Sequence, residues 1–503
     1  MAALTAFRVF PNLYQDSVSL MQIAAKLRAR DGVDEASCVM ATPANLAQLR
    51  DADLTVDACA GPSDLLVVVR GSGTAAAEAL DAADALLRAP PAPASAGAAY
   101  EAPLTSIAAA VERDSAIDLA LISVPGAYAA AEALKAIALG LDVMLFSDNV
   151  TIEEERKIKC EAQARGRIVM GPDCGTAIVN GVPLGFANVV RRGDIGLVAA
   201  SGTGLQEVTC RIHNAGAGVS QALGTGGRDL SEEIGGITML AGLRALAEDA
   251  QTRVIVLVSK PPAPAIARGI VDLAAGAGKP VVIHFLGASA PMDAPRLHVA
   301  RSLRHAADCA VALAQGRAPP PFSDSVDAAL RGAVTPPPAG RRFVRGLFTG
   351  GTFCYEAQLA FLARGLPCSS NAPVEGAAAI DGKVSGHAFV DYGDDEYTRG
   401  RPHPMIDPSL RNAAMRSHAS DPQTSAILFD VVLGYGAHAD PATDLAATIR
   451  AVRASRVAAI GHVCGTDGDP QGKAAQVATL IDAGAIVADS NYEAAALAAH
   501  FAR

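Results

Sequence analysis

Several features that would place the chain in a membrane or on nucleic acid are missing from its sequence. No uninterrupted apolar run reaches the ~18 residues that a membrane-spanning helix needs, and the N-terminus lacks the charged region, apolar stretch and cleavage site of a secretory leader. There is no basic run of five or more residues, and the formal net charge is −10. We therefore expect a soluble protein that binds neither nucleic acid nor an anionic membrane surface.

The cysteines show no pairing at redox or metal-binding spacing. Nine are scattered through the 503 residues without a CxxC pair. An odd, dispersed set in a large chain is typical of reduced thiols, so we expect a cytoplasmic protein. The sequence also contains no GxxxxGK[ST] motif, which excludes nucleotide binding through a P-loop.

Half of the residues are apolar, and aromatic side chains make up only 4%, so small residues dominate. Short apolar runs alternate with helical patterns, which predicts the α/β fold class: several Rossmann- or flavodoxin-like domains with parallel sheets, plus a small N-terminal α+β domain. The expected units are an N-terminal domain at 1–90, a linker at 91–103, a Rossmann domain at 104–192, a second α/β domain at 193–320, a linker at 321–340 and a flavodoxin-like domain at 341–503.

The sharpest local signal is a turn between a predicted strand, Ile195–Ala199, and a predicted helix. Ser201, Gly202 and Thr203 form this turn, and Glu207 follows within the helix. Free backbone N–H groups and the positive end of the helix dipole would face one spot, which suits a phosphate. An ordinary serine-capped helix after a strand would give the same local sequence, and this alternative stays open.

The same arrangement recurs where the strand Val344–Phe348 is followed by Gly350, Gly351 and Thr352. Two such turns favour a shared site in which both helix N-termini hold one anion. Two further glycine-rich pieces follow predicted strands, where open α/β sheets bind ligands, although either could simply punctuate a loop. These pieces contain Gly226 and Gly227, and Gly171, Pro172 and Cys174.

The order of these motifs resembles the α subunit of succinyl-CoA synthetase. Val124 and Pro125, followed by Gly171-Pro172-Asp173-Cys174, resemble its CoA-binding domain, and Ser201-Gly202-Thr203 with Gly226-Gly227 resembles its phosphate-binding ligase domain. Residues 341–503 resemble the carboxy-terminal domain of the β subunit, fused into one chain. The ATP-grasp domain of that β subunit is missing.

With Phe146-Ser147-Asp148-Asn149-Val150 and the stretch from Gly386 to Asp394, the whole chain most resembles the FdrA family. Members are usually described as acyl-CoA synthetases, and some are implicated, with partner subunits, as an oxamate carbamoyltransferase in ureide breakdown. The resemblance implies CoA as a possible cofactor, a CoA-like region that includes Asn149, and a phosphate, acyl phosphate or carbamoyl phosphate as substrate.

Two catalytic candidates follow from the same resemblance, Glu207 and His298. His298 lies at the spacing of the parent family's phosphohistidine, but no glycine flanks it and its surroundings predict a helix, so a structural role is the alternative. Glu207 lies in the helix after the first turn.

The densest polar cluster of the sequence follows the strand near residue 390. It predicts a substrate pocket in which an arginine pairs with a carboxylate, whereas a solvated surface loop is the alternative. Its spacing matches no zinc or EF-hand pattern, so we expect no metal. The pocket residues would be His387, Asp391, Arg399 and Arg401.

Three functions remain open at this point. The first is an acyl-CoA synthetase or ligase of the FdrA type, and the second is carbamoyl transfer to a small acceptor such as oxamate. The third is a non-catalytic subunit that binds phosphate and organises partners. Each fits a small anionic ligand and either a homodimer or a complex with other subunits.

Overall fold

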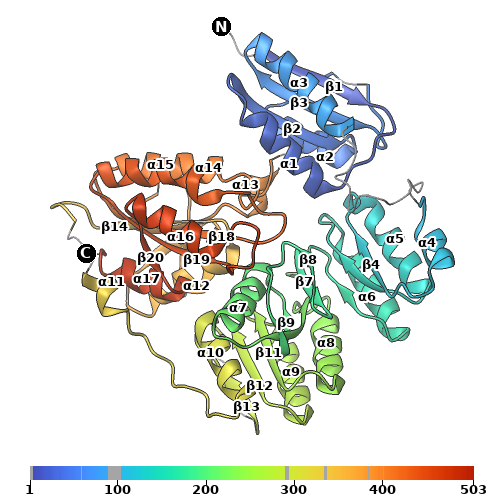
Figure 1. Ribbon diagram of the computed structural model, residues 1–503, viewed down its shortest axis with the longest axis vertical. Coiled ribbons are helices and arrows are strands. Elements are labelled where there is room, and N and C mark those ends of the chain that lie inside the picture. Colours follow the sequence, from blue (N-terminus) through green and yellow to red (C-terminus); the bar gives the residue numbers. More distant parts are fainter. Residues whose placement is uncertain are drawn as a thin grey trace.

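The computed structural model describes residues 4–57, 59–88, 104–288, 294–332, 337–382, 384–399 and 401–502. Within these residues four sheets form, and each sheet with its helices makes one lobe of the molecule (Figure 1). The fold is therefore α/β with several parallel-sheet lobes, as predicted. The expected linker at 91–103 lies outside the described residues.

The N-terminal lobe is a three-stranded antiparallel sheet in the order β1-β3-β2. The central strand β3 reads Leu-Leu-Val-Val-Val, and these five residues are fully buried because helices or loops cover both faces. Its elements are β1 (Leu4–Phe10), α1 (Ser17–Arg28), β2 (Val33–Met40), α2 (Pro43–Asp51), β3 (Leu65–Gly71) and α3 (Gly73–Arg88).

The second lobe is a small parallel sheet in the order β4-β5-β6. Helix α6 begins at a capping box, in which Thr151 and Glu154 bond each other's backbone N–H groups. The elements are α4 (Ile107–Arg113), β4 (Leu119–Ile122), α5 (Gly126–Ala138), β5 (Asp142–Leu145), α6 (Ile152–Ala164) and β6 (Val169–Met170).

The middle lobe has a seven-stranded sheet in the order β13-β12-β11-β9-β10-β7-β8. Helices α7 and α10 cover one face, and α8 and α9 pack on the other. Its elements are β7 (Thr176–Val179), β8 (Val182–Gly185), β9 (Arg192–Ala199), α7 (Gly202–Asn214), β10 (Val219–Gly224), α8 (Ile237–Glu248), β11 (Val254–Ser259), α9 (Pro264–Gly276), β12 (Val281–Phe285), β13 (Leu297–Val299) and α10 (Leu303–Ala314).

The sheets do not follow the expected unit 104–192, because β7 and β8 pair within the middle lobe. They form a hairpin around Asn180 and Gly181, whose φ angles of 52° and 82° suit a two-residue turn. This Asn-Gly turn could have been recognised in the sequence. The strand to which the hairpin adds, β10, could not, because that pairing is non-local.

The C-terminal lobe has a seven-stranded parallel sheet in the order β16-β15-β17-β14-β18-β19-β20. It is the third parallel α/β unit that the sequence predicts. Its elements are β14 (Phe343–Phe348), α12 (Gly351–Leu362), β15 (Cys368–Ser370), β16 (Ala378–Ala379), β17 (His387–Asp391), α13 (Asp395–Thr398), α14 (Ser409–Ser420), β18 (Thr424–Val432), α15 (Pro441–Ala454), β19 (Ala458–Cys464), α16 (Lys473–Asp482), β20 (Ile486–Ala488) and α17 (Asn491–Ala499); α11 (Ala328–Gly332) precedes them.

The middle and C-terminal lobes share one hydrophobic core. Helices α7 and α10 face α12 and α17, and apolar side chains from both sheets meet between them (Figure 1). The N-terminal lobe touches the C-terminal lobe through polar pairs instead. Arg28 bonds Asp407, and Arg401 lies 3.6 Å from Glu35.

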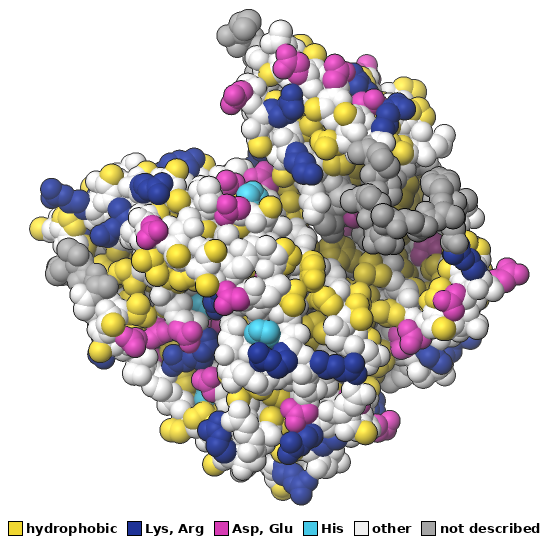
Figure 2. All heavy atoms as spheres, in the orientation of Figure 1, with side chains coloured by type: hydrophobic (Ala, Val, Ile, Leu, Met, Phe, Trp, Pro, Cys, Tyr) yellow, Lys and Arg dark blue, Asp and Glu magenta, His cyan; other side chains and the backbone are white. Residues whose placement is uncertain are grey.

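The face in Figure 2 shows apolar side chains gathered around the hollow where the lobes meet, and charges of both signs interspersed over the outer surfaces. None of the helices in the described ranges combines the length and the apolar character needed to cross a bilayer.

A buried charge cluster ties helix α6 to the loop after β10. The Lys159 side chain is fully buried, and its Nζ lies 2.8 Å from Glu155 and 2.7 Å from Asp229. Asp229 also accepts bonds from the backbone of Thr238 and Met239 at the start of α8. Lys159 therefore holds together the second and the middle lobe.

Replacing Lys159 should destabilise the protein strongly, because Lys159→Met leaves Asp229 buried without its cation and Glu155 with Arg228 alone. We expect a loss of about 3–5 kcal/mol in the first unfolding transition, measured in urea. Lys157→Met changes an exposed lysine of the same helix and should stay near the wild-type midpoint. Equal midpoints for the two variants would show that the cluster does not stabilise the fold.

Candidate functional site

The first predicted turn is built as the sequence indicates. Strand β9 ends at Ala199, and Ser201 caps α7 by accepting a bond from the Gly204 backbone at 3.0 Å. A Cβ on Gly204 would lie 2.5 Å from the Ser201 Oγ, so the cap requires glycine there. The amides of Gly202 and Thr203 have no intrahelical carbonyl to bond, and they stand at the positive end of the helix.

The second turn is held by an acidic side chain that the sequence analysis missed. Asp430, on β18, accepts bonds from the Thr349 amide at 2.7 Å, the Thr349 hydroxyl at 2.8 Å and the Gly350 amide at 2.8 Å. Arg411 pairs with this buried carboxylate. The next two first-turn amides, those of Gly351 and Thr352, lie beyond the reach of these bonds.

The two turns meet. The Ser201 Oγ lies 2.5 Å from the Thr352 Oγ1, and the Thr203 methyl group packs where a Cβ on Gly350 would stand. Ser201 and Gly351 are partly exposed whereas Thr352 is buried, so the contact is partly buried. Residues about 150 positions apart in sequence thus bring two helix N-termini to one point, as the repeated motif predicts.

A lysine stands beside this point. Five strands of the middle sheet follow the order β10-β9-β11-β12-β13, in which the crevice for ligands opens between the carboxyl ends of β9 and β11. Lys260 follows β11 directly, and its Nζ lies 5.5 Å from the ring centre of Tyr355 on α12. Lys260 is not among the residues predicted from the sequence, although its place immediately after a buried apolar strand is a usable signal.

Asp391 completes the site from the C-terminal lobe. It ends β17, it is 8% exposed, and its Oδ1 accepts a bond from the Gly393 amide at 2.9 Å. Its Oδ2 lies 2.5 Å from where a Cβ on Gly351 would be. Desolvation raises the pKa of Asp391 to about 7, helped by Asp394 and Asp430 and opposed by the Gly393 amide and Lys260.

The four residues expected to form one substrate pocket do not come together. His387 begins the strand that Asp391 ends, so the two lie about 13 Å apart. The His387 Nδ1 accepts the Val344 amide at 3.1 Å, and the residue lines a separate cavity of about 350 Å³. Arg401 faces Glu35 of the N-terminal lobe, and Arg399 is exposed. These residues are close in sequence, but strand β17 and the loop that follows it place them at different points of the molecule.

His298 lies in strand β13 and not in the helix that its surroundings predict. It pairs with Val282 at the sheet edge, where partial burial lowers its pKa. Strand β13 is three positions from β9, about 14 Å across the sheet. The structure therefore does not bring His298 to the meeting point of the two turns.

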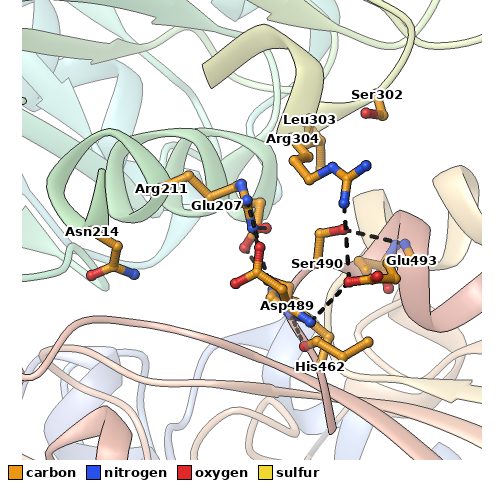
Figure 3. A network of polar contacts seen from close by, with 12 residues as sticks. Glu207, Arg211, Asn214, Ser302, Leu303, Arg304, His462, Asp489, Ser490 and Glu493 are labelled. Carbon is orange, nitrogen blue, oxygen red and sulfur yellow. Dashed lines mark hydrogen bonds and ion pairs between the residues drawn. The ribbon is translucent and has the colours of Figure 1, made fainter. Parts of the chain in front are cut away.

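Glu207 and its counterpart on α12, Glu356, both cross the interface between the lobes. The Glu207 Oε2 lies 2.8 Å from the His462 Nε2, next to the Arg211–Asp489 ion pair (Figure 3). Burial acts to raise the pKa of Glu207, but His462 and Arg211 outweigh it, and the pKa lies below its ordinary value.

Glu356 reaches from the C-terminal lobe to the middle lobe. Its Oε1 accepts the Leu303 amide at the start of α10, and its Oε2 accepts the Asn491 side chain of α17, both at 2.9 Å. The two glutamates therefore fasten the helix pairs to each other, away from the solvent-exposed turns.

The loop with Gly226 and Gly227, expected to bind phosphate, packs on the Gly171-Pro172 loop of the CoA-like region. Gly226 lies against the backbone of Gly171 and Pro172, so closely that a Cβ would be 2.3 Å from the Pro172 oxygen. Gly227 faces open space. Cys174 is buried and its pKa is raised to about 12, chiefly by desolvation, which suits a packing role.

The other residues of the CoA-like region line the carboxyl ends of the second sheet. Pro125 precedes α5, and the Val124 carbonyl accepts the Ser147 hydroxyl at 2.5 Å. Asn149 adopts φ 54°, and its carbonyl touches the position of a Cβ on Gly126. These residues face a different sheet from the two turns.

Three family descriptions match parts of the chain. The CoA-ligase family matches residues 347–501, the CoA-binding domain matches residues 190–287, and the AllF heavy metal-associated domain matches residues 1–103. The CoA-binding match falls on the middle lobe, whereas the motifs of the sequence predict the CoA-like region at 104–192.

The matched heavy metal-associated region contains two cysteines, Cys38 and Cys59, and no histidine. The turn from Pro11 to Asp16 has no cysteine or histidine, and burial raises the pKa of Cys38 to about 12. In the described parts of the chain no group of three or more His, Cys, Asp or Glu side chains is placed to hold a metal ion.

Among known proteins, YahF of Escherichia coli (strain K12) is 40% identical over 508 residues, covering 98% of this chain and 97% of that protein. The succinate–CoA ligase [ADP-forming] subunit alpha of Staphylococcus aureus (strain Mu50) is 26% identical over 186 residues, which are 36% of this chain and 60% of that subunit. An acetyl-coenzyme A synthetase from Ca. Korarchaeum cryptofilum is 15% identical, covers 76% of this chain and 82% of its own, and has a TM-score of 0.33.

Removing the Glu207 charge should weaken the interface between the lobes. We expect Glu207→Gln to lower stability at neutral pH by about 1–3 kcal/mol, because a buried hydrogen-bonded charge is lost. Since the folded-state pKa is depressed, the advantage of wild type is complete above the ordinary glutamate pKa and disappears as the pH falls through the folded value. Thermal unfolding across this range measures it.

Glu232→Gln, at an exposed position, serves as the control and should unfold like wild type at each pH. A Glu207→Gln curve parallel to wild type down to acid pH would contradict the expected linkage.

Proposed function

The chain belongs to the same family as YahF of Escherichia coli, and on that premise we propose that it is a CoA-ligase-type enzyme subunit that holds a phosphate or acyl phosphate between α7 and α12. The observation that carries this proposal is the contact of Ser201 with Thr352. An anion that replaces this contact would meet two hydroxyls, the free amides of two first turns and the positive ends of two helices.

The hydrogen-bond donors of such a site are in place before the reaction begins. The donors are fixed by the strand ends and by Asp430, so they need no rearrangement when negative charge develops on a departing phosphate. Lys260 adds an exposed cation at the rim. The arrangement suits transfer of an acyl group between phosphate and an acceptor, and the CoA-ligase and CoA-binding matches favour CoA as that acceptor. Within this class we propose the FdrA type.

A second candidate is carbamoyl transfer from carbamoyl phosphate to a small amide such as oxamate. The direct contact of the two turns favours it, because a ligand that binds to both turns has to be compact. Carbamoyl phosphate is a small dianion with its acyl group attached, and it could be made elsewhere. Other subunits would then complete the pathway.

Removing both hydroxyls should abolish tight binding of the anion. We expect Ser201→Ala/Thr352→Ala to bind inorganic phosphate about ten- to a hundredfold more weakly than wild type in isothermal titration, since each hydroxyl donates to a charged acceptor. Ser417→Ala, an exposed serine of α14, should bind like wild type. Equal affinity of the double variant, or no binding of phosphate by wild type, would remove the basis of the proposed function.

The same titration separates the two candidates. Heat with CoA supports the ligase, whereas heat with carbamoyl phosphate and none with CoA supports carbamoyl transfer. If the protein binds phosphate but turns over neither acetyl phosphate nor carbamoyl phosphate, a non-catalytic subunit is favoured.

A further inference from the structure

Asp391 is an acidic side chain placed where an anion is expected to bind. Its Oδ2 lies against the α carbon of Gly351, whose amide is one of the free first-turn donors, and the side chain is more than nine-tenths buried. The Asn371 side chain bonds both the Asp391 amide, at 2.8 Å, and its carbonyl, at 3.0 Å, so the backbone is fixed. An ionised carboxylate here would repel a phosphate.

The position of the proton follows from the hydrogen bonds. The Asp391 Oδ1 accepts a hydrogen bond from the Gly393 amide and so acts as the carbonyl oxygen of the carboxyl group. A neutral carboxyl group carries its proton on Oδ2, the atom that faces Gly351. The group is then a hydrogen-bond donor among the donors of the two helix termini.

Acyl transfer from a phosphate needs such a donor. When the bond between the acyl carbon and the bridging oxygen of an acyl phosphate dianion breaks, the electron pair stays on oxygen and phosphate would leave as a trianion. A proton delivered to the bridging oxygen at that moment makes the leaving group hydrogen phosphate instead. Helix dipoles and amides stabilise negative charge, but they cannot transfer a proton.

We propose that Asp391 is a catalytic acid, whose Oδ2 proton passes to the bridging oxygen as the acceptor's nitrogen or sulfur forms its bond to the acyl carbon. This proposal rests on the proposed phosphate site. After the step Asp391 is a carboxylate beside hydrogen phosphate, and their repulsion promotes release of the product. The proton that the acceptor loses returns to Asp391 directly or through water and restores the neutral group.

The charged groups around Asp391 act in opposing directions. Desolvation is the largest influence and favours the neutral form, with a pKa of about 7. Asp394, on the following loop, and Asp430, on β18, also favour it, whereas Lys260 at the end of β11 favours the carboxylate. His403 reaches toward Gly393, but burial lowers its pKa to about 4, so it is neutral near pH 7. Cys354 on α12 is buried and stays a thiol.

Sulfate is the appropriate probe for the proton, because its own charge does not change near neutral pH whereas that of phosphate does. Wild type should bind sulfate below pH 7 and lose about tenfold in affinity for each pH unit above it, as Asp391 ionises. Asp391→Asn keeps a hydrogen-bond donor but has no proton to lose. We expect this variant to bind sulfate with little pH dependence and to release phosphate from acetyl or carbamoyl phosphate at least a hundredfold more slowly.

Two controls make the outcome specific. Asp394→Asn removes a neighbouring negative charge and should keep the pH dependence, with its midpoint shifted to lower pH. Ser201→Ala/Thr352→Ala reports whether sulfate occupies the two turns at all. An Asp391→Asn variant whose sulfate affinity falls with pH as in wild type, or which releases phosphate at the wild-type rate, overturns the assignment of Asp391 while the phosphate site stands. Absence of sulfate and phosphate binding by wild type at every pH overturns both.

Discussion

The packing of two helix pairs against each other is the constraint on which the site depends. Helices α7 and α10 of the middle lobe meet α12 and α17 of the C-terminal lobe in one shared core. Polar bonds then set the register, because Glu207 reaches His462 on β19 and Glu356 reaches the start of α10. A helix that slid by one turn would move its N-terminus by about 5 Å, and the two turns would no longer touch.

The two halves of the site divide the available donors between the fold and a ligand. Asp430 takes the amides of Thr349 and Gly350, whereas those of Gly351 and Thr352 stay free. In α7 the Ser201 hydroxyl takes only the Gly204 amide. In each helix one carboxylate or hydroxyl therefore fixes the turn, and the neighbouring backbone amides stay without a bond to it. A turn held in this way is rigid before an anion arrives.

The sequence predicts the two turns of this site, but not the residues that other strands place beside them. The repeated strand, small-residue turn and helix identified both turns, and the spacing of six residues from Ser201 to Glu207 recurs from Gly350 to Glu356. Lys260 and Asp430 were missed because they belong to the site only through strand order, which short-range patterns do not encode. His387 was grouped with Asp391 for the opposite reason, since residues close in sequence can stand at opposite ends of one strand.

The equal spacing in α7 and α12 has a consequence for how the chain works. Each glutamate lies six residues after the residue that begins its own turn and bonds an element of the other lobe, so the bonds that join the lobes also fix the positions of the two turns. Neither lobe alone contains a complete site, because one supplies Ser201 and Lys260 and the other Thr352 and Asp391. A change that loosens the interface would therefore separate the two turns before it unfolds either sheet. Stability of the interface and function of the site rest on the same contacts.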